Sequence, residues 1–456
     1  MTAGLTSVPG HAFGARYDLP VPLSLFVLGG AVVVFVSFLV VLPTRVAAAS
    51  GTPEADRARL RTDGIAAGGA AWLIVALLVA CGLAGSQVVS ENLLPTAFWL
   101  LAWVAAPVTC GVLGDWTRAV NPFAALARAV DRDGLRRALI GGPALPWPSR
   151  LAWWPATALF VAVASGELVF NATATVPRAT ALAILSYAVV TTAGSILFGA
   201  GPWLERGEMF SVLYATWGRL GWFRFGAPGR RGFLGGLDAP FEPVASRVTF
   251  VLLLLVSVSF DGLLATPAWR DARTRLPGGL APGTLGYELA EVAAFLVLAL
   301  AAWGLFGGFA VLVTRAGRLA MSRVQAVAGL LPSLLPIAFG YLLAHNLEYL
   351  VINGQLLLPL LGNPAGLDGW HRFGYPFNDD YVVNTDLLPS SVVWYLQVAL
   401  IIAVHIAAVI LAHRHLARTA GDERRARRAE WPWIVAMVGY TMTSLWLLAQ
   451  PLVKEG

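Results

Sequence analysis

Residues 246–266 read SRVTFVLLLLVSVSFDGLLAT, and this stretch decides the class of fold. As one helix, its apolar run is long enough to cross the ~30 Å hydrocarbon core of a bilayer. Similar runs fill most of the chain: 57% of the 456 residues are hydrophobic, 13% are charged, and the mean hydropathy is +0.69. These values exclude an ordinary soluble domain. The sequence predicts an all-α, polytopic integral membrane helical bundle.

We expect about ten transmembrane helices, because ten apolar runs approach the ~20 residues that one crossing requires. Together they form a single transmembrane domain over 20–453, after an external segment at 1–19. The runs hold too much Ala, Leu and Gly for a membrane β-barrel, whose strands would be short and alternating. The predicted spans are 20–43, 65–85, 93–114, 151–170, 178–200, 246–266, 285–314, 326–351, 392–413 and 433–452.

The basic residues predict the orientation, since cytoplasmic loops carry an excess of Lys and Arg. With both termini outside, the five inner loops hold 25 of the 32 basic residues. We therefore expect an N-out, C-out protein in the plasma or inner membrane of a bacterial cell. The net charge of +6 then reflects topology and contact with anionic lipid, and does not indicate nucleic-acid binding. The expected partners are the lipid bilayer and a small-molecule substrate.

A weak internal repeat appears where the third and fifth spans reach the cytoplasm. Gly114, Trp116, Phe123 and Leu126 match Gly201, Trp203, Phe210 and Leu213 at a constant offset of 87 residues. Each copy continues with apolar positions at helical spacing, which predicts interfacial amphipathic helices near 117–138 and 205–220. The offset covers two crossings, so a true duplication would be parallel. Chance identity at the membrane edge is the alternative.

Most ionisable side chains inside the spans fall in the outer half. At ~1.5 Å per residue, Glu167, Asp261 and His345 lie ~24, ~21 and ~28 Å above the inner ends of their helices. Glu291 lies within the first two turns of a span that starts outside. Charged groups in a bilayer are costly and usually functional. We expect an outward-facing site with Glu291, Asp261 and Glu167 as its catalytic or proton-accepting residues.

The same cluster contains candidate metal ligands. Glu348 follows His345 at i+3, so both lie on one helix face, and imidazole with carboxylate suits a divalent transition metal: zinc, iron or copper. His405 lies ~11 Å or more below His345, which argues against one shared metal and leaves a proton path or a packing role open. A proton or substrate site without metal, and purely structural contacts, are the alternatives for the whole cluster.

The external loop at 352–391 is the second candidate region, because long loops are often functional. Its acidic residues and His371 can close over the membrane cluster as a lid. The N-terminal segment HAFGARYDLP, with His11, is expected on the same side and can also contribute. The alternative is a surface loop whose aromatic side chains rest on lipid headgroups.

Three segments resemble a bacterial family of integral membrane proteins often labelled fenitrothion hydrolase: HAFGARYDLPVPL at 11–23, AHNLEYLVINGQLLLPLL at 344–361, and VVWYLQVALIIAVHIAAVILAHRHLAR at 392–418. The family pattern differs at two places, where this chain has Asn346 and Val404. The residues that correspond to the family pattern are His11, His345, Gln355, His405 and His413.

The resemblance implies hydrolysis of an organophosphate triester by metal-assisted attack of water on phosphorus. His345 and Glu348 would hold the ion, and Glu291 or Asp261 would take the proton. His405 and His11 are the other candidate metal ligands. The residues alone leave two other functions open: a proton- or ion-coupled transporter of a small solute, or an assembly or electron-transfer subunit with a membrane or periplasmic partner protein. The Gly- and Pro-interrupted stretch LLPSLLPIAFGY at 330–341 is typical of transport sites.

Overall fold

The computed structural model describes residues 23–41, 65–225, 232, 234–277, 280–370 and 372–449. This part of the chain is mostly helical and contains no β-strand, as the sequence predicts. Seven helical segments are long and apolar enough to cross a membrane. They are Ala67–Ala84, Leu93–Leu113, Pro177–Phe198, Ala245–Leu264, Leu285–Gly317, Arg323–Gly362 and Ser391–Ala420.

The other three predicted spans are also helical, at α1 (Leu23–Val41), α7 (Trp154–Leu168) and α18 (Glu423–Ala449). Apolar stretches of only 10–17 residues are found in α1 and α7, at Val27–Phe38 and Trp154–Leu168. The first turns of α18 contain the arginine-rich sequence ERRARR, which lowers its mean hydropathy. Length and composition therefore distinguish these three helices from the other seven.

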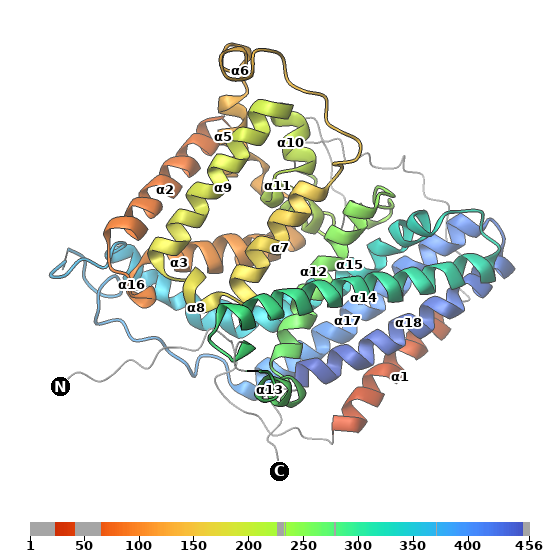
Figure 1. The fold of residues 1–456 in the computed structure, drawn as a ribbon. Helices are drawn as coiled ribbons and strands as arrows, with labels where there is room; N and C mark the ends of the chain where they lie inside the picture. The colour runs from red at the N-terminus through yellow and green to blue at the C-terminus, as the bar shows by residue number, and fades with distance from the viewer. Residues whose placement is uncertain are drawn as a thin grey trace.

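The helices form two bundles that lie side by side (Figure 1). The N-terminal bundle contains α2 (Ile65–Ala84), α3 (Leu93–Thr96), η3 (Ala97–Ala105), α4 (Ala106–Leu113), α5 (Pro122–Val130), α6 (Asp133–Ile140), α7, α8 (Asn171–Ala174), α9 (Pro177–Phe198), α10 (Ala200–Arg206) and α11 (Met209–Trp217). The C-terminal bundle contains α12 (Ala245–Leu264), α13 (Pro267–Thr274), α14 (Leu285–Gly317), α15 (Arg323–Ile352), α17 (Ser390–Ala420) and α18. The short helix α16 (Leu357–Gly362) follows α15 and lies beside α3 of the N-terminal bundle.

Although α1 comes first in the sequence, it completes the C-terminal bundle against α17 and α18 (Figure 1). Gly30 makes close approach possible, because a Cβ there would lie 2.2 Å from Cδ1 of Leu445. Gly30 is near the start of α1 and Leu445 is near the end of α18. The two helices are therefore antiparallel, and the first and last described helices begin and end at the same side of the bundle.

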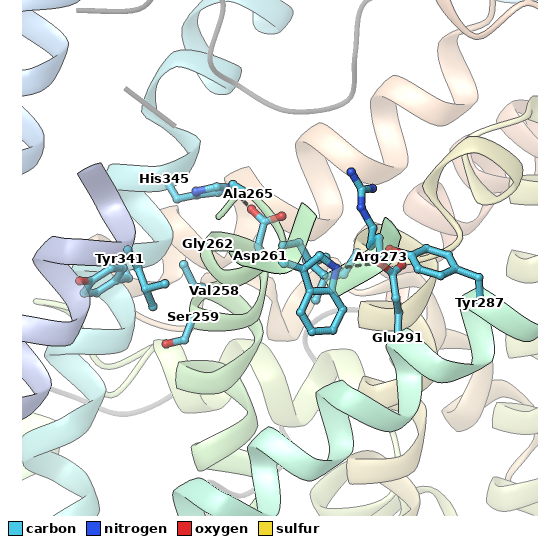
Figure 2. A pocket seen from close by; sticks show the side chains of 14 residues that line it. Val258, Ser259, Asp261, Gly262, Ala265, Arg273, Tyr287, Glu291, Tyr341 and His345 are labelled. Carbon is cyan, nitrogen blue, oxygen red and sulfur yellow. Dashed lines mark hydrogen bonds and ion pairs between the residues drawn. The ribbon is translucent and has the colours of Figure 1, made fainter. Parts of the chain in front are cut away.

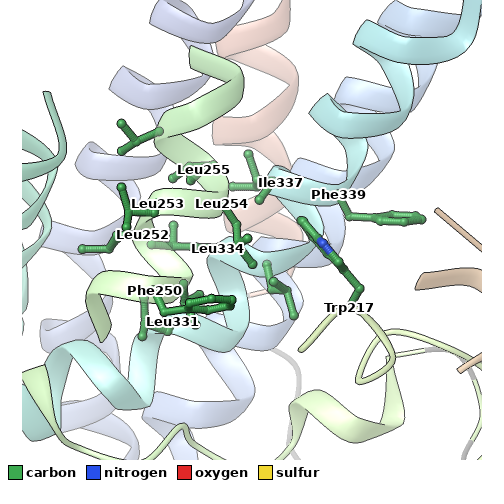
Figure 3. Close-up of a cluster of buried hydrophobic side chains, with 14 of the residues drawn as sticks. Trp217, Phe250, Leu252, Leu253, Leu254, Leu255, Leu331, Leu334, Ile337 and Phe339 are labelled. Atoms are coloured by element: carbon green, nitrogen blue, oxygen red, sulfur yellow. The ribbon is translucent and has the colours of Figure 1, made fainter. Parts of the chain in front are cut away.

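The hydrophobic core lies where α12 meets α15 (Figure 3). Leu252 and Leu255 of α12 are almost fully buried, as are Leu331 and Leu334 of α15. The N-terminal bundle joins this core through Trp217 of α11, whose ring centroid is 5.9 Å from that of Phe339 on α15 and lies beside it in Figure 3. Burial of such side chains, in contact across both bundles, holds the two bundles together.

The repeat found in the sequence corresponds to a repeated arrangement of helices. The first and last residues of α11 lie 87 residues after the first and last residues of α5. Both helices follow a long apolar segment that ends at a glycine with positive φ, Gly114 (113°) or Gly199 (82°), where a side chain would be strained.

Equivalent residues of the two copies contact each other. Asn121 caps the N-terminus of α5 and Glu208 caps that of α11, and Nδ2 of Asn121 donates a 3.1 Å hydrogen bond to Glu208 Oε2. The rings of Phe123 and Phe210 stack with centroids 5.6 Å apart and an interplanar angle of 8°. Contacts between equivalent residues are what a two-fold axis produces. The two copies therefore meet at equivalent positions.

The two helices of the repeat differ in burial, although we expected both to be interfacial. Within α11, Ala215 is exposed and Ser211 is partly exposed, while the other side chains are buried. Most side chains of α5 are only partly buried, and Ala129 is exposed. Phe123 of α5 and Phe210 of α11, on the apolar faces of these helices, stack on each other. By contrast, α6 does expose apolar side chains, with Leu139 61% exposed, as an interfacial helix would.

Candidate functional site

The centre of the candidate site is an ion pair between α12 and α15. Nε2 of His345 lies 2.5 Å from Oδ2 of Asp261, and their side chains are only 20% and 9% exposed. Asp261 follows the leucine run of α12, and His345 follows the stretch of α15 that contains Pro332 and Pro336. The structure thus brings together two of the residues that we singled out in the sequence.

A cavity of about 290 Å³ lies on one side of this pair, between α12, α13, α14 and α15 (Figure 2). Glu291 of α14 lines it and accepts a 3.2 Å hydrogen bond from Trp269 Nε1 and another from the Tyr287 hydroxyl. Arg273 of α13 lines the same cavity. The cavity therefore contains both acidic and basic groups within a largely apolar wall, which suits a small solute with a polar group.

A second, smaller cavity of about 60 Å³ lies on the other side of the pair, between the two bundles. His345 and Asp261 line both cavities. Glu167 reaches this cavity from α7 and accepts a 2.5 Å hydrogen bond from Trp103 Nε1. Its carboxylate interacts electrostatically with Asp261 and with His345. Titratable groups of the two bundles thus face each other across their boundary.

A π-helix positions the indole of Trp103. The segment η3 has the wider hydrogen-bonding pattern, and the Ala106 N–H donates to Leu101 O, five residues back. The Tyr214 hydroxyl of α11 donates a 2.7 Å bond to Ala102 O inside the same segment. Short π-helical segments are uncommon and often occur at functional sites. Here the π-helix links α11 to Glu167.

The candidate metal ligands are not gathered into one place. His345 is paired with Asp261, and Glu348 lines neither of the two cavities. His405 is 1% exposed, and its Nδ1 is 2.7 Å from Ile401 O on its own helix. His11 lies outside the described residues. Across the described ranges, no three His, Cys, Asp or Glu side chains lie close enough together to hold a metal ion.

The other residues of the family pattern are also dispersed. Gln355 donates a 3.0 Å bond to Asn384 O and accepts one of 3.0 Å from Asn384 N, so it anchors the external loop. His413 pairs with Glu430 on α18.

The acidic side chains of the external loop do not close over the site. Asp368, Asp379, Asp380 and Asp386 are exposed, and none of them lines either cavity. His371, the other residue in the predicted lid, lies outside the described residues. The loop therefore supplies no described side chain to the walls around the His345–Asp261 pair.

Several side chains of the site were missed in the sequence: Trp103, Trp269, Arg273 and Tyr287. Tyr287 precedes Glu291 by four residues, so the helical i,i+4 spacing was an available signal. Trp103 and Glu167 are 64 residues apart, and no local pattern joins them.

We find no match to this chain among protein-family models, curated proteins or solved structures.

Proposed function

We propose that this chain is a proton-coupled transporter of a small solute, with His345 and Asp261 as its proton-binding pair. The single observation that carries the proposal is the position of this pair between two cavities, one of them at the boundary of the two helix bundles. Transporters commonly place substrate and coupling-ion sites between two moving units near the middle of the membrane. Buried ionisable groups in such places typically mark a proton or ion path.

The topology belongs to the same proposal: ten crossings, with both termini outside, in the plasma or inner membrane of a bacterial cell. The distribution of Lys and Arg supports it, because the predicted inner loops hold most of them. The antiparallel packing of α1 on α18 supports an even number of crossings. In this orientation the pair and both cavities lie in the outer half of the membrane.

Proton binding would change the attraction between the bundles. A protonated, positively charged His345 lies between two carboxylates, Asp261 on its own bundle and Glu167 on the other. It attracts both, and at the low dielectric of a protein interior this attraction is strong. When the proton leaves, the two carboxylates face each other around a neutral imidazole and repel. Proton occupancy therefore favours one arrangement of the bundles over another, as coupling requires.

The proposal is tested by charge movement in the purified protein. Proteoliposomes on a solid-supported membrane are exposed to a step in pH, and the transient current reports protons that bind within the membrane field. We expect a current in the wild type that disappears in Asp261→Asn, and a larger one when a transported solute is added from a panel of small organic acids, amines and esters. No current in the wild type, with or without solutes, would overturn the proposal.

Hydrolysis of an organophosphate-type ester is the second candidate, and one observation favours it. A carboxylate that fixes a histidine beside a cavity is the arrangement of a general base, which can take a proton from attacking water. Arg273 in the same cavity can stabilise negative charge on a phosphoryl oxygen. The described residues do not form the three-ligand set that the metal-assisted route requires. Release of nitrophenol from a nitrophenyl phosphotriester, lost in His345→Gln, would favour this candidate.

A further inference from the structure

A second pair of a histidine and a carboxylate lies far from the cavities, near the α17–α18 turn. Nδ1 of His413 is 2.9 Å from Oε1 of Glu430, and the side chains are 7% and 1% exposed. Glu430 Oε2 is buried and has no hydrogen-bond partner in the described structure. A buried carboxylate with an unused oxygen is costly when it is charged, and a proton on that oxygen removes the cost.

The position of this pair along the membrane follows from how α17 packs on α15. Near the outer end, Gln397 donates a 2.8 Å hydrogen bond to Ala344 O, next to His345. Near the inner end, a Cβ on Gly329 would lie 2.4 Å from His415 Nε2. The two helices are therefore antiparallel neighbours along their length. His413 lies at the end opposite to His345, about 16 residues, or ~24 Å of helix, beyond Gln397.

Polar side chains lie between the outer His345–Asp261 pair and the inner His413–Glu430 pair. The Ser259 hydroxyl, in the wall of the larger cavity, is 3.0 Å from the Tyr440 hydroxyl of α18. Farther along α18, Trp433 Nε1 donates a 3.2 Å bond to Ser333 Oγ on α15. Tyr440, Trp433 and Glu430 are spaced by seven and three residues, so they lie on one face of α18.

His405 supplies a titratable group at the intermediate level. Its Nε2 is buried without a hydrogen-bond partner in the described structure, and it precedes His413 by eight residues, or ~12 Å of helix. Chains of Asp, Glu and His side chains within the membrane form the proton relays of pumps and transporters.

We infer that His413 and Glu430 form an inner proton-binding site, at which protons that enter through the outer pair leave toward the cytoplasm. This inference rests on the proposed transport function and extends it to the opposite side of the membrane. The structure supports it by the geometry of the pair, by its place at the arginine-rich end of the bundle, and by the polar side chains that lead to it.

The inner pair lies at the end of the bundle where basic side chains predominate. The helix α1 has no ionisable side chain within Leu23–Val41. At this end the neighbouring helices carry the following charged or titratable groups: Arg247 on α12, Arg315 on α14, Arg323 on α15, Arg414, His415 and Arg418 on α17, and Glu423, Arg424, Arg425, Arg427 and Arg428 on α18. Arg418 pairs with Asp238, and Arg427 with Glu423. The charged side chains at this end of the bundle are therefore mostly basic.

The test applies the pH step to one face at a time. Right-side-out and inside-out vesicles carrying the full-length protein are adsorbed to a solid-supported membrane, and the wild type is compared with Glu430→Gln. His415→Gln is the matched control, because His415 is a partly buried histidine of the same helix that lies against Gly329. We expect Glu430→Gln to lose the current from inner-face steps and to keep the Asp261-dependent current from outer-face steps. The control should keep both.

The possible results distinguish a failure of the inner proton-binding site from a failure of the proposed transport function. An unchanged inner-face current in Glu430→Gln would overturn the inner site and leave the transport proposal standing. No current from either face in the wild type would overturn the transport proposal itself. If Glu430→Gln does not fold, infrared difference spectra of the wild type and Glu430→Asp replace it. A carboxyl band that responds to inner-face pH and shifts in Glu430→Asp supports the inference, and a band that does not shift contradicts it.

Discussion

The two histidine–carboxylate pairs have the same chemistry and opposite surroundings. His345 and Asp261 line two cavities, and a third titratable group, Glu167, faces them from the other bundle. His413 and Glu430 line neither cavity and are almost completely enclosed. The two pairs therefore differ in their access to the cavities and not in residue type. The His345–Asp261 pair can contact a solute, whereas the His413–Glu430 pair is enclosed.

Removing the charge of Asp261 should have the largest effect on the currents that report the outer pair. In Asp261→Asn, the His345 imidazole loses its ion-pair partner while the shape of the site is kept. We expect both proton-driven current and solute-dependent current to disappear, because the two cavities share this pair. The measurement is the pH-step current with and without solute. A solute-dependent current that survives would show that the outer pair is not where proton and solute are coupled.

Truncation of the enclosed pair should have the largest effect on stability. Glu430→Ala leaves His413 buried without its partner, and breaking a buried pair in this way costs about 3–5 kcal/mol. Asp261→Asn, in the more accessible pair, should cost less, about 1–3 kcal/mol. Denaturant unfolding of both variants in detergent measures the free energies. Equal losses would mean that the two pairs are equally enclosed in the membrane protein.

A smaller effect is expected from Trp103→Phe, which removes the donor to Glu167 and keeps the aromatic ring. An unsatisfied buried acceptor costs about 1–3 kcal/mol. Trp99→Phe is the matched control, since Trp99 lies on the same π-helix, is similarly buried, and its Nε1 has no hydrogen-bond partner in the described structure. The free energy of unfolding should fall in the first variant and change little in the second. A larger loss of unfolding free energy in Trp99→Phe than in Trp103→Phe would show that Glu167 is not part of the outer site.

The smallest effect should come from Tyr440→Phe, which removes the hydroxyl that meets Ser259. One neutral hydrogen bond contributes about 1 kcal/mol, so the fold should persist. If this hydroxyl lies on the path between the two pairs, the inner-face current should rise more slowly while its total charge is kept. An unchanged rise time would place the path elsewhere, and the two pairs would then be linked by another route.

The sequence predicted the class of fold because apolar runs leave little choice in a membrane. It also identified Asp261, Glu167, Glu291 and His345, since charged groups inside such runs stand out. It did not predict the pairing of His345 with Asp261: local spacing placed Glu348 on the same helix face as His345, whereas Asp261 lies 84 positions earlier in the chain. Spacing along one helix gives no information about which helix lies opposite.

The internal repeat was also only partly predictable from the sequence. Four identities suggested it, and one of them, Phe123 with Phe210, joins the copies, but the hydrogen bond between the copies is between Asn121 and Glu208, which are different residue types. A search for identical positions passes over such a pair. The sequence also could not predict the burial of α11, because an apolar helix face is equally suited to contact with lipid and with another helix.

The contact between Asn121 and Glu208 has a consequence for the ancestry of the chain. If the two copies descend from one gene, the ancestral protein paired with a second copy of itself through this surface, and one residue type met its own copy at the axis. Two glutamates there would have repelled each other at 3 Å, whereas two asparagines can share a hydrogen bond. Fusion of the copies into one chain let them diverge, so that a single carboxylate could be buried where a symmetric dimer would have had to bury two.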